Sequence, residues 1–168
     1  MSESVREVFE ANAAYVWRTL RCMGVAERDV EDGCQEVFVV VHRRLDQFQP
    51  GTSLRAWIHA ICLRVASAYR RRARVRFEEP VDPQPENAFV DTTGRQLDQT
   101  LARRELGRLL DRLDDDKRAV FVLYEIEQLT MKEVAAACAC PLQTAYSRLH
   151  AARDALAALV RQRSEVTG

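Results

Sequence analysis

Seven arginines and no acidic residue lie between Arg55 and Arg76, and five of the seven fall within positions 70–76. Guanidinium groups at this density suit phosphate, because each carries a permanent positive charge and donates several hydrogen bonds. Arginine supplies 23 of the 25 basic residues of the chain, and only Lys117 and Lys132 are lysines. A solvated face with acids nearby in space is the alternative, but the absence of acids within the run favours phosphate binding.

A helix-turn-helix pattern near the C-terminus offers a second surface for a polyanion. Thr130 and Glu133 have the spacing of a capping box, which starts a short helix, and a break at 139–141 precedes a longer helix. In this motif the second helix presents its N-terminal half to the major groove of DNA. A plain helical hairpin with a polar outer face is the alternative. The solvent face of the longer helix carries donors, acceptors and cations that suit base edges and phosphates, namely Gln143, Thr144, Tyr146, Ser147, Arg148, His150 and Arg153.

Side chains that could support catalysis or hold a metal are present but scattered. Cys138 and Cys140 are separated by one residue rather than the two of a zinc knuckle, and the three histidines lie far apart in the sequence. We expect this cysteine pair to fill space at the turn rather than to sense redox state. The sequence has no nucleophile elbow, glycine-rich phosphate loop or HExxH motif. We therefore expect no enzymatic activity of its own, no cofactor and no metal.

The elements that must position these residues are helices. Apolar residues recur three and four positions apart over most of the chain, which is the helical period. Asp29 occupies the expected N-cap of the first clear stripe, and the Gln-Pro-Gly-Thr-Ser cluster at 49–53 ends that stripe. Six glycines and five prolines are too few for a fold rich in strands and turns. The predicted fold class is all-α, with apolar stripes over 30–48, 54–68, 97–113 and 142–159.

Residues 78–96 divide the chain into two modules. This segment has three prolines within six residues, frequent acids and no helical period, which is typical of a flexible linker. It separates a first module over 1–77 from a second over 97–168. Charge changes sign along the chain, with a net +4 over 1–77, −6 over 78–116 and +2 over 117–168. This pattern suggests two small modules that face a polyanion, joined by an acidic connector.

Length and composition indicate a globular protein inside the cell. The 168 residues are 47% apolar and 30% charged. Uncharged apolar runs such as 37–41 are far shorter than the roughly 20 residues of a membrane span, and the first ten residues do not resemble a secretory signal. Five cysteines, an odd number without a disulfide pattern, indicate reduced thiols. We expect a cytoplasmic location and no insertion into a membrane.

Four stretches of the chain stand out in order, namely DVEDGCQEVF (29–38), LRAWIHAICLRVASAYRRR (54–72), LDDDKRAVFVLYEIEQLTMKEVA (113–135) and PLQTAYSRLHAARDAL (141–156). Together they resemble the extracytoplasmic-function (ECF) group of bacterial RNA polymerase sigma factors. The resemblance extends from about Val5 to Val160. It implies two small helical domains joined by the linker, with sigma region 2 over 1–77 and the helix-turn-helix of region 4 over 97–168.

The resemblance implies that the protein directs core RNA polymerase to specific promoters and initiates transcription. Its implied partners are core polymerase (clamp helices and flap), promoter DNA and an anti-sigma factor. The positions that match core-docking residues are Asp32, Gln35 and Glu36. Those that match the minus-ten contacts are Phe48, Ile61 and Arg64 around the pocket for a flipped base, and Arg70, Arg71, Arg72 and Arg74 along the DNA backbone. The seven residues on the solvent face of the longer helix, from Gln143 to Arg153, match the minus-thirty-five contacts, and we call them the recognition face.

In the first module the chain departs from the family pattern at three positions. Arg64 stands where Asn is usual and Ala68 where Asp is frequent. Both flank the minus-ten pocket and bear on its base preference. Gly33 stands where a large apolar residue is usual, and we expect it to weaken its helix by about 1 kcal/mol relative to alanine.

The second module shows three further departures. Tyr146 and Ala151 stand where basic residues are common, which predicts a weaker salt dependence of binding to the minus-thirty-five element. Ala139 stands where a turn glycine is usual, which predicts a strained residue at positive φ or a turn of different shape.

Two other functions are compatible with the pattern. A free-standing helix-turn-helix regulator would use the first module for dimerisation or sensing, and it would protect an operator by itself. A helical adaptor without DNA contact would show no salt-dependent DNA binding, even in the presence of polymerase. A sigma factor would bind promoters tightly only together with core polymerase.

Overall fold

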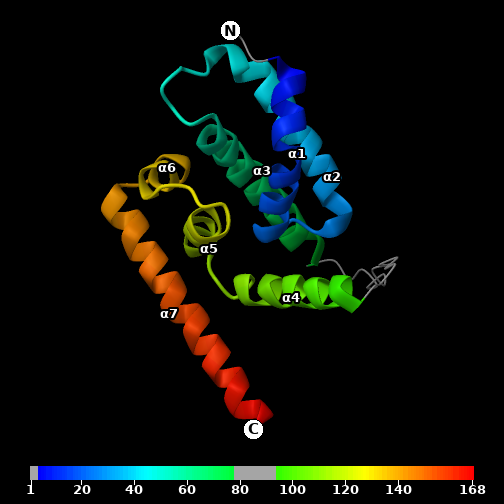
Figure 1. Cartoon of the computed structure of the whole chain (residues 1–168), viewed down its shortest axis with the longest axis vertical. Helices are drawn as coiled ribbons and strands as arrows, with labels where there is room; N and C mark the ends of the chain where they lie inside the picture. The colour runs from blue at the N-terminus through cyan, green and yellow to red at the C-terminus, as the bar shows by residue number, and fades with distance from the viewer. Residues whose placement is uncertain (1–3, 78–93) are drawn as a thin grey trace.

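The computed structural model describes residues 4–77 and 94–168, and every regular element in these two ranges is helical (Figure 1). The all-α prediction is therefore confirmed. In chain order the elements are α1 (Val5–Cys22), α2 (Glu27–Arg44), the 3₁₀ turn η1 (Leu45–Gln47), α3 (Leu54–Phe77), α4 (Gly94–Leu110), α5 (Asp115–Phe121), the π-helical turn η2 (Val122–Ile126), α6 (Met131–Ala137) and α7 (Leu142–Thr167).

The first module is a bundle of α1, α2 and α3, which lie side by side in Figure 1. A capping box between Ser4 and Glu7 starts α1. The prediction that Asp29 caps α2 is wrong, because α2 begins at Glu27 with Ala26 at the N-cap position. Asp29 lies instead in the first turn of the helix, where its negative charge complements the helix dipole.

The second module contains the predicted helix-turn-helix. Asp114 caps α5, since its side chain accepts a hydrogen bond from the backbone of Lys117 at 2.9 Å. The predicted capping box between Thr130 and Glu133 starts α6. Ala139, in the turn between α6 and α7, has a φ of 51°. This positive φ is one of the two outcomes predicted for an alanine where a turn glycine is usual.

One boundary and the burial of one residue differ from the sequence prediction. Helix α4 begins at Gly94, so the last three residues of the expected 78–96 linker belong to it; Arg95 and Gln96 are good helix formers. The rest of the expected linker lies outside the described residues. Leu142 was expected on the buried stripe of the last helix, but it is 42% exposed because it lies in the first turn, at the edge of the contact with α6.

The two modules pack against each other, which the sequence did not predict. Figure 1 shows α5 lying between α3 and α7. One core cluster joins residues of the first bundle such as Leu20 and Ile58 to Leu110 and Val122 of the second module. A second cluster brings Ala56 of α3 into the core formed by α5, α6 and α7. We call this packing of the two modules the closed arrangement. None of the described helices is long and apolar enough to cross a membrane.

Candidate nucleic-acid interface

The basic end of α3 forms the first part of the candidate interface. Arg64 and Arg71 are exposed to solvent. Arg70 is mostly buried, and its Nη1 atom lies 2.9 Å from Oδ1 of Asp115, at the start of α5. Arg74 is paired with the same carboxylate, at 3.5 Å. The structure thus brings two of the predicted DNA-backbone arginines together on an acid of the second module.

Arg72 and Glu36 lie together, although the sequence assigned them to different partners. Nη1 of Arg72 is 3.7 Å from Oε1 of Glu36, and its guanidinium lies 4.7 Å from the centre of the Tyr69 ring. The hydroxyl of Tyr69 donates a hydrogen bond to Glu36 at 3.0 Å. Burial and this bond raise the pKa of Tyr69 above its ordinary value. The pairing orients Glu36 on the half-buried edge of α2, whereas Asp32 and Gln35 are exposed.

The residues expected around the minus-ten pocket do not all reach the surface. Phe48 is half-buried and stacks on Trp57, with ring centroids 5.5 Å apart. Ile61 is 4% exposed and belongs to the core, so it does not face solvent in this arrangement, and its role in a base pocket stays a prediction. The reason is its position four residues before Val65 on the buried face of α3. The half-buried rings of Phe48 and Trp57 provide the apolar surface that best fits the predicted pocket for a flipped base.

The recognition face is displayed on the N-terminal half of α7. The buried residues Ala145, Leu149 and Ala152 fix this helix against α5 and α6 and thereby turn the opposite side to solvent. An open depression on that side is lined by residues that include Gln143 and Tyr146 as well as Tyr124 of η2. Of the recognition face, Gln143, Tyr146, Ser147, His150 and Arg153 are exposed, and Thr144 and Arg148 are half-buried.

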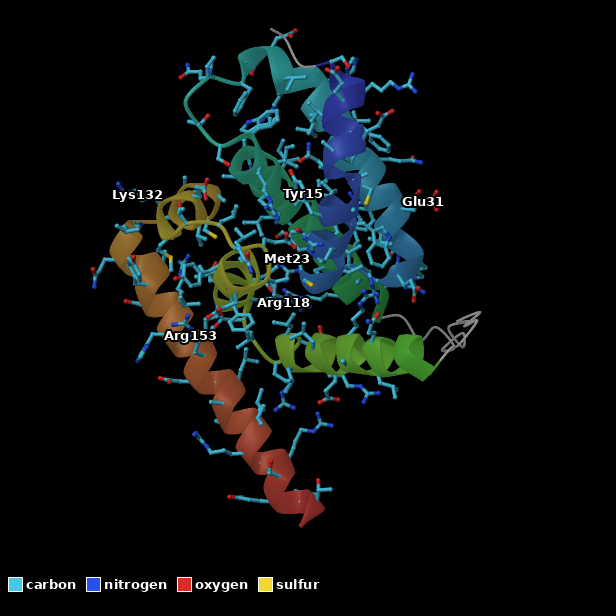
Figure 2. All side chains as sticks on the ribbon, in the orientation of Figure 1. Tyr15, Met23, Glu31, Arg118, Lys132 and Arg153 are labelled. Carbon is cyan, nitrogen blue, oxygen red and sulfur yellow. The ribbon has the colours of Figure 1, made fainter. Side chains whose placement is uncertain are left out.

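Acids of the second module lie close to two arginines and one histidine of the recognition face. Arg148 lies 3.3 Å from Oδ2 of Asp116. Arg153 of α7, labelled in Figure 2, donates from Nε to Glu125 of η2 at 2.6 Å. His150 and Asp154 are 3.9 Å apart, one turn apart on the same helix. Phosphate would compete with these carboxylates for both arginines.

Both modules match known protein families. Residues 8–76 match the family described as Sigma-70 region 2, and residues 103–156 match Sigma-70, region 4. The chain is 33% identical over 140 residues to the ECF RNA polymerase sigma factor EcfG of Rhodopseudomonas palustris, covering 74% of that protein. The chain belongs to the ECF group of RNA polymerase sigma factors.

Two further relatives agree with this assignment, and two solved structures share the fold. Identity is 32% over 153 residues to the sigma factor CnrH of Cupriavidus metallidurans, with 80% of that protein covered. Sequence identity to SigE of Mycolicibacterium smegmatis is 31% over 160 residues, and this sigma factor spans only 59% of the length of that protein. In fold, it resembles CnrH in complex with the cytosolic domain of CnrY, with a TM-score of 0.73, 24% identity and 94% and 88% of the two chains covered. It also resembles the sigma factor RpoE in complex with the anti-sigma factor NepR from Bartonella quintana, with a TM-score of 0.64, 22% identity and 92% and 98% covered.

The sigma factor also contains a buried acid that the sequence analysis missed. Glu127, just after η2, has a fully buried side chain. Arg18 of α1 donates to both of its carboxylate oxygens, at 2.8 and 2.7 Å, and Arg55 of α3 donates to Oε2 at 3.2 Å. Nε2 of the buried His59 is 4.0 Å from Oε2. We call Glu127, Arg18, Arg55 and His59 the Glu127 cluster.

The charges in the Glu127 cluster follow from burial and pairing. Burial alone would raise the pKa of Glu127, but the hydrogen bond and positive charge of Arg18 outweigh it, so the pKa lies below its ordinary value. Burial lowers the pKa of His59 to about 4; the charge of Glu127 opposes this effect, while Arg55 and Arg18 reinforce it. At neutral pH the carboxylate is therefore charged and the imidazole is neutral.

A sequence signal for Glu127 existed. It follows Leu123 by four residues and Val120 by seven, a spacing that would put it on the apolar side of a regular helix. A charged residue in such a stripe predicts a buried ion pair. Its partners could not be found in the same way, because Arg18 and Arg55 lie 109 and 72 residues away.

The cysteines and acids show no arrangement for metal chemistry within the described residues. No group of three or more histidine, cysteine or acidic side chains in that part of the chain is placed to hold a metal ion. Burial raises the pKa of the Cys138 thiol to about 12 and that of Cys62 still further. These two thiols are therefore poor nucleophiles at neutral pH.

Proposed function

We propose that this sigma factor binds core RNA polymerase through α2, reads the minus-ten element with α3 and the segment after η1, and reads the minus-thirty-five element with α7. The observation that supports this most directly is the exposed, polar recognition face on a helix that α5 and α6 hold in place. Such a surface can contact base edges and phosphates without any change in its own module.

The outer face of α2 is the proposed docking site for the polymerase. Asp32 and Gln35 are exposed, Glu36 is held beside them by Tyr69, and the apolar Val39 is 46% exposed in the same helix. An acidic rim around an exposed apolar side chain suits a basic partner surface with an apolar centre. The clamp helices are the proposed partner here, and the flap is the proposed partner of the second module.

The remaining proposals concern regulation and cellular location. Relatives of similar fold have been solved in complex with an anti-sigma factor or with the cytosolic domain of another protein. We infer that an anti-sigma factor also binds this chain and covers its polymerase-binding or DNA-binding faces. The protein would act in the cytoplasm with the polymerase, and it would supply binding surfaces rather than catalysis.

Run-off transcription with purified core polymerase tests the polymerase contact. Asp32→Arg should abolish co-purification with core polymerase and specific transcription, with the helical circular dichroism signal unchanged. Glu165→Arg makes the same charge change at an exposed position near the C-terminus of α7 and should leave both intact. If Asp32→Arg retained full core binding, the docking assignment would be wrong.

The recognition face is tested on a library of genomic fragments. Ser147→Ala and Arg148→Ala should lower transcription from the selected promoters with little change in affinity for core polymerase. Unchanged promoter choice in both variants would contradict the minus-thirty-five role. Tight protection of an operator by the protein alone would instead support a free-standing regulator.

A further inference from the structure

We propose that Arg64 reads a guanine of the minus-ten element through a bidentate contact, and that Ala68 leaves its guanidinium unpaired for this role. The inference rests on the proposed function and deepens it, because it names the base that α3 selects and the side chain that selects it. Both positions depart from the family pattern, and they lie one turn apart on the same side of the helix.

Arg64 lacks the carboxylate partner that other arginines of α3 have. Of the seven arginines between positions 55 and 76, those paired with a carboxylate within the described residues are Arg55, Arg70, Arg72 and Arg74. Arg64 is exposed and forms no ion pair with any residue that the structure describes. The residues one turn before and one turn after it, Ala60 and Ala68, carry no charge. The donors of its guanidinium are therefore available to a ligand.

The alanine at position 68 explains why Arg64 is unpaired. An aspartate, which is frequent in the family at this position, would stand four residues after Arg64. Side chains at that spacing are neighbours on a helix, and opposite charges there attract each other. The two departures are therefore complementary, since one supplies a guanidinium and the other removes the acid that would hold it.

Arg64 lies near the aromatic pair at the start of α3. It follows Trp57 by seven residues, which puts both side chains on one face of the helix, about 10 Å apart along its axis. Helical side chains lean toward the N-terminus of their helix, so Arg64 leans toward Trp57 and its partner Phe48. Figure 1 shows α3 running from the far end of the first bundle toward α4. A base stacked on the two rings would place its neighbour in the strand within reach of Arg64.

The donors of arginine fit guanine better than the other bases. A guanidinium presents parallel N–H donors and no acceptor. Guanine offers two adjacent acceptors, O6 and N7, on an edge that is free in both paired and unpaired DNA, whereas adenine and thymine offer one acceptor there. The small side chains of Ala60 and Ala68 leave room for a base edge beside Arg64. Unpaired cytosine, with O2 and N3, is the alternative that the experiment must exclude.

Transcription with purified core polymerase supplies the test. A promoter recovered from the genomic fragments is rebuilt with its minus-ten element randomised, and the templates that yield transcripts are sequenced. Wild-type protein should enrich guanine at one position by about tenfold or more. Arg64→Asn and Arg64→Lys should both lose this enrichment, because lysine keeps the charge but cannot make the bidentate contact. Arg161→Asn removes an exposed arginine near the end of α7 and should retain the enrichment.

Variants at position 68 test the part played by the missing acid. Ala68→Asp should lower the enrichment of guanine about two- to fivefold, because the carboxylate competes with the base for Arg64. Ala68→Asn adds nearly the same volume without the charge and should lower the enrichment less. Equal effects of the two substitutions would overturn the role assigned to Ala68.

A change of one atom in the DNA identifies the edge that is read. In 7-deazaguanine a carbon replaces N7, which removes one of the two acceptors. At the enriched position this base should weaken binding of the wild-type holoenzyme about tenfold in a filter-binding titration. It should not weaken binding by the Arg64→Asn holoenzyme, since the contact is already absent.

The outcomes separate this inference from the proposed function. Specific transcription without a guanine preference, or with one that Arg64→Asn leaves intact, would overturn the inference alone. A preference for cytosine that depends on Arg64 would overturn the choice of guanine, and a preference retained by Arg64→Lys would overturn the bidentate contact. Absence of specific transcription with wild-type protein would overturn the proposed function and this inference with it.

Discussion

Gly33 lies in the helix that carries the proposed polymerase contacts. Its replacement by alanine has two effects on the free energy of unfolding, which oppose each other and are of known size. Alanine favours a helix over glycine by about 1 kcal/mol. A Cβ atom at this position, however, would lie 3.2 Å from Cδ1 of Leu20 and 3.7 Å from Cε2 of Tyr69. Leu20 is fully buried, so it cannot move aside without displacing other core atoms.

Overpacking of a dense core by one methyl group costs about 1–3 kcal/mol. We therefore expect Gly33→Ala to lower the free energy of unfolding by about 1 kcal/mol net, despite the better helix propensity. Gly107→Ala is the matched control, since Gly107 is also helical but has open space where its Cβ would lie. It should raise the free energy of unfolding by up to about 1 kcal/mol.

Replacement of Leu20 separates the effect of close packing at Gly33 from the effect of helix propensity. Leu20→Ala alone should cost about 2–5 kcal/mol because it leaves a cavity. In that background Gly33→Ala should become stabilising by about 1 kcal/mol, since its methyl group no longer meets Cδ1. Urea unfolding followed by circular dichroism measures all four proteins at constant m-value. If Gly33→Ala had the same effect with and without Leu20, close packing at Gly33 would be refuted.

Three further predictions concern the buried histidine, the turn and the recognition helix. The pKa of His59 is about 4 in the folded protein against 6.5 in the unfolded chain, so its stabilising contribution is complete above pH 6.5 and falls as the pH drops toward 4. Unfolding at pH 7 and pH 5 should differ by about 2 kcal/mol from this group, and His59→Asn should lack that dependence. Ala139→Gly should raise the free energy of unfolding by about 1 kcal/mol, because only glycine adopts a φ of 51° without strain; a loss of stability would contradict this. Asp116→Asn releases Arg148 from its carboxylate partner and should tighten binding of the polymerase holoenzyme to a minus-thirty-five element about two- to fivefold in a filter-binding titration, whereas weaker binding would show that the pair positions Arg148.

The helices could be predicted from the sequence because their signals are local. The Thr130–Glu133 capping box, the Asp114 cap and the strained Ala139 turn each depend on residues within four positions of one another. The start of α2 was misplaced by the same local rules, because an acid in the first turn and an acid at the N-cap give similar patterns. The polar side of α7 was likewise a consequence of helical period alone.

The contacts between the modules could not be predicted in this way. Glu127 meets Arg18 and Arg55 only because two separate helices converge on it, and no spacing rule joins residues so far apart in sequence. The burial of Ile61 in the core has a similar origin, since family resemblance assigns a role to a position without showing which side of the helix is covered. Sequence reasoning therefore predicted the helices better than it predicted which of their surfaces remain accessible.

The charge pattern of the chain acquires a different meaning in the closed arrangement. The excess of acids before position 117 was interpreted as a solvated connector, yet each acid from 111 to 116 contacts a cation of the folded protein. Asp111 is paired with Arg118, Asp115 with two arginines of α3, and the others with Lys117 and Arg148. The exposed pair of Lys117 and Asp114 is weak and is screened by salt, whereas the side chains of Arg70 and Arg118 are largely buried in their pairs. If Arg70 and Arg148 bind DNA as proposed above, phosphate must displace the carboxylates of Asp115 and Asp116 that hold them.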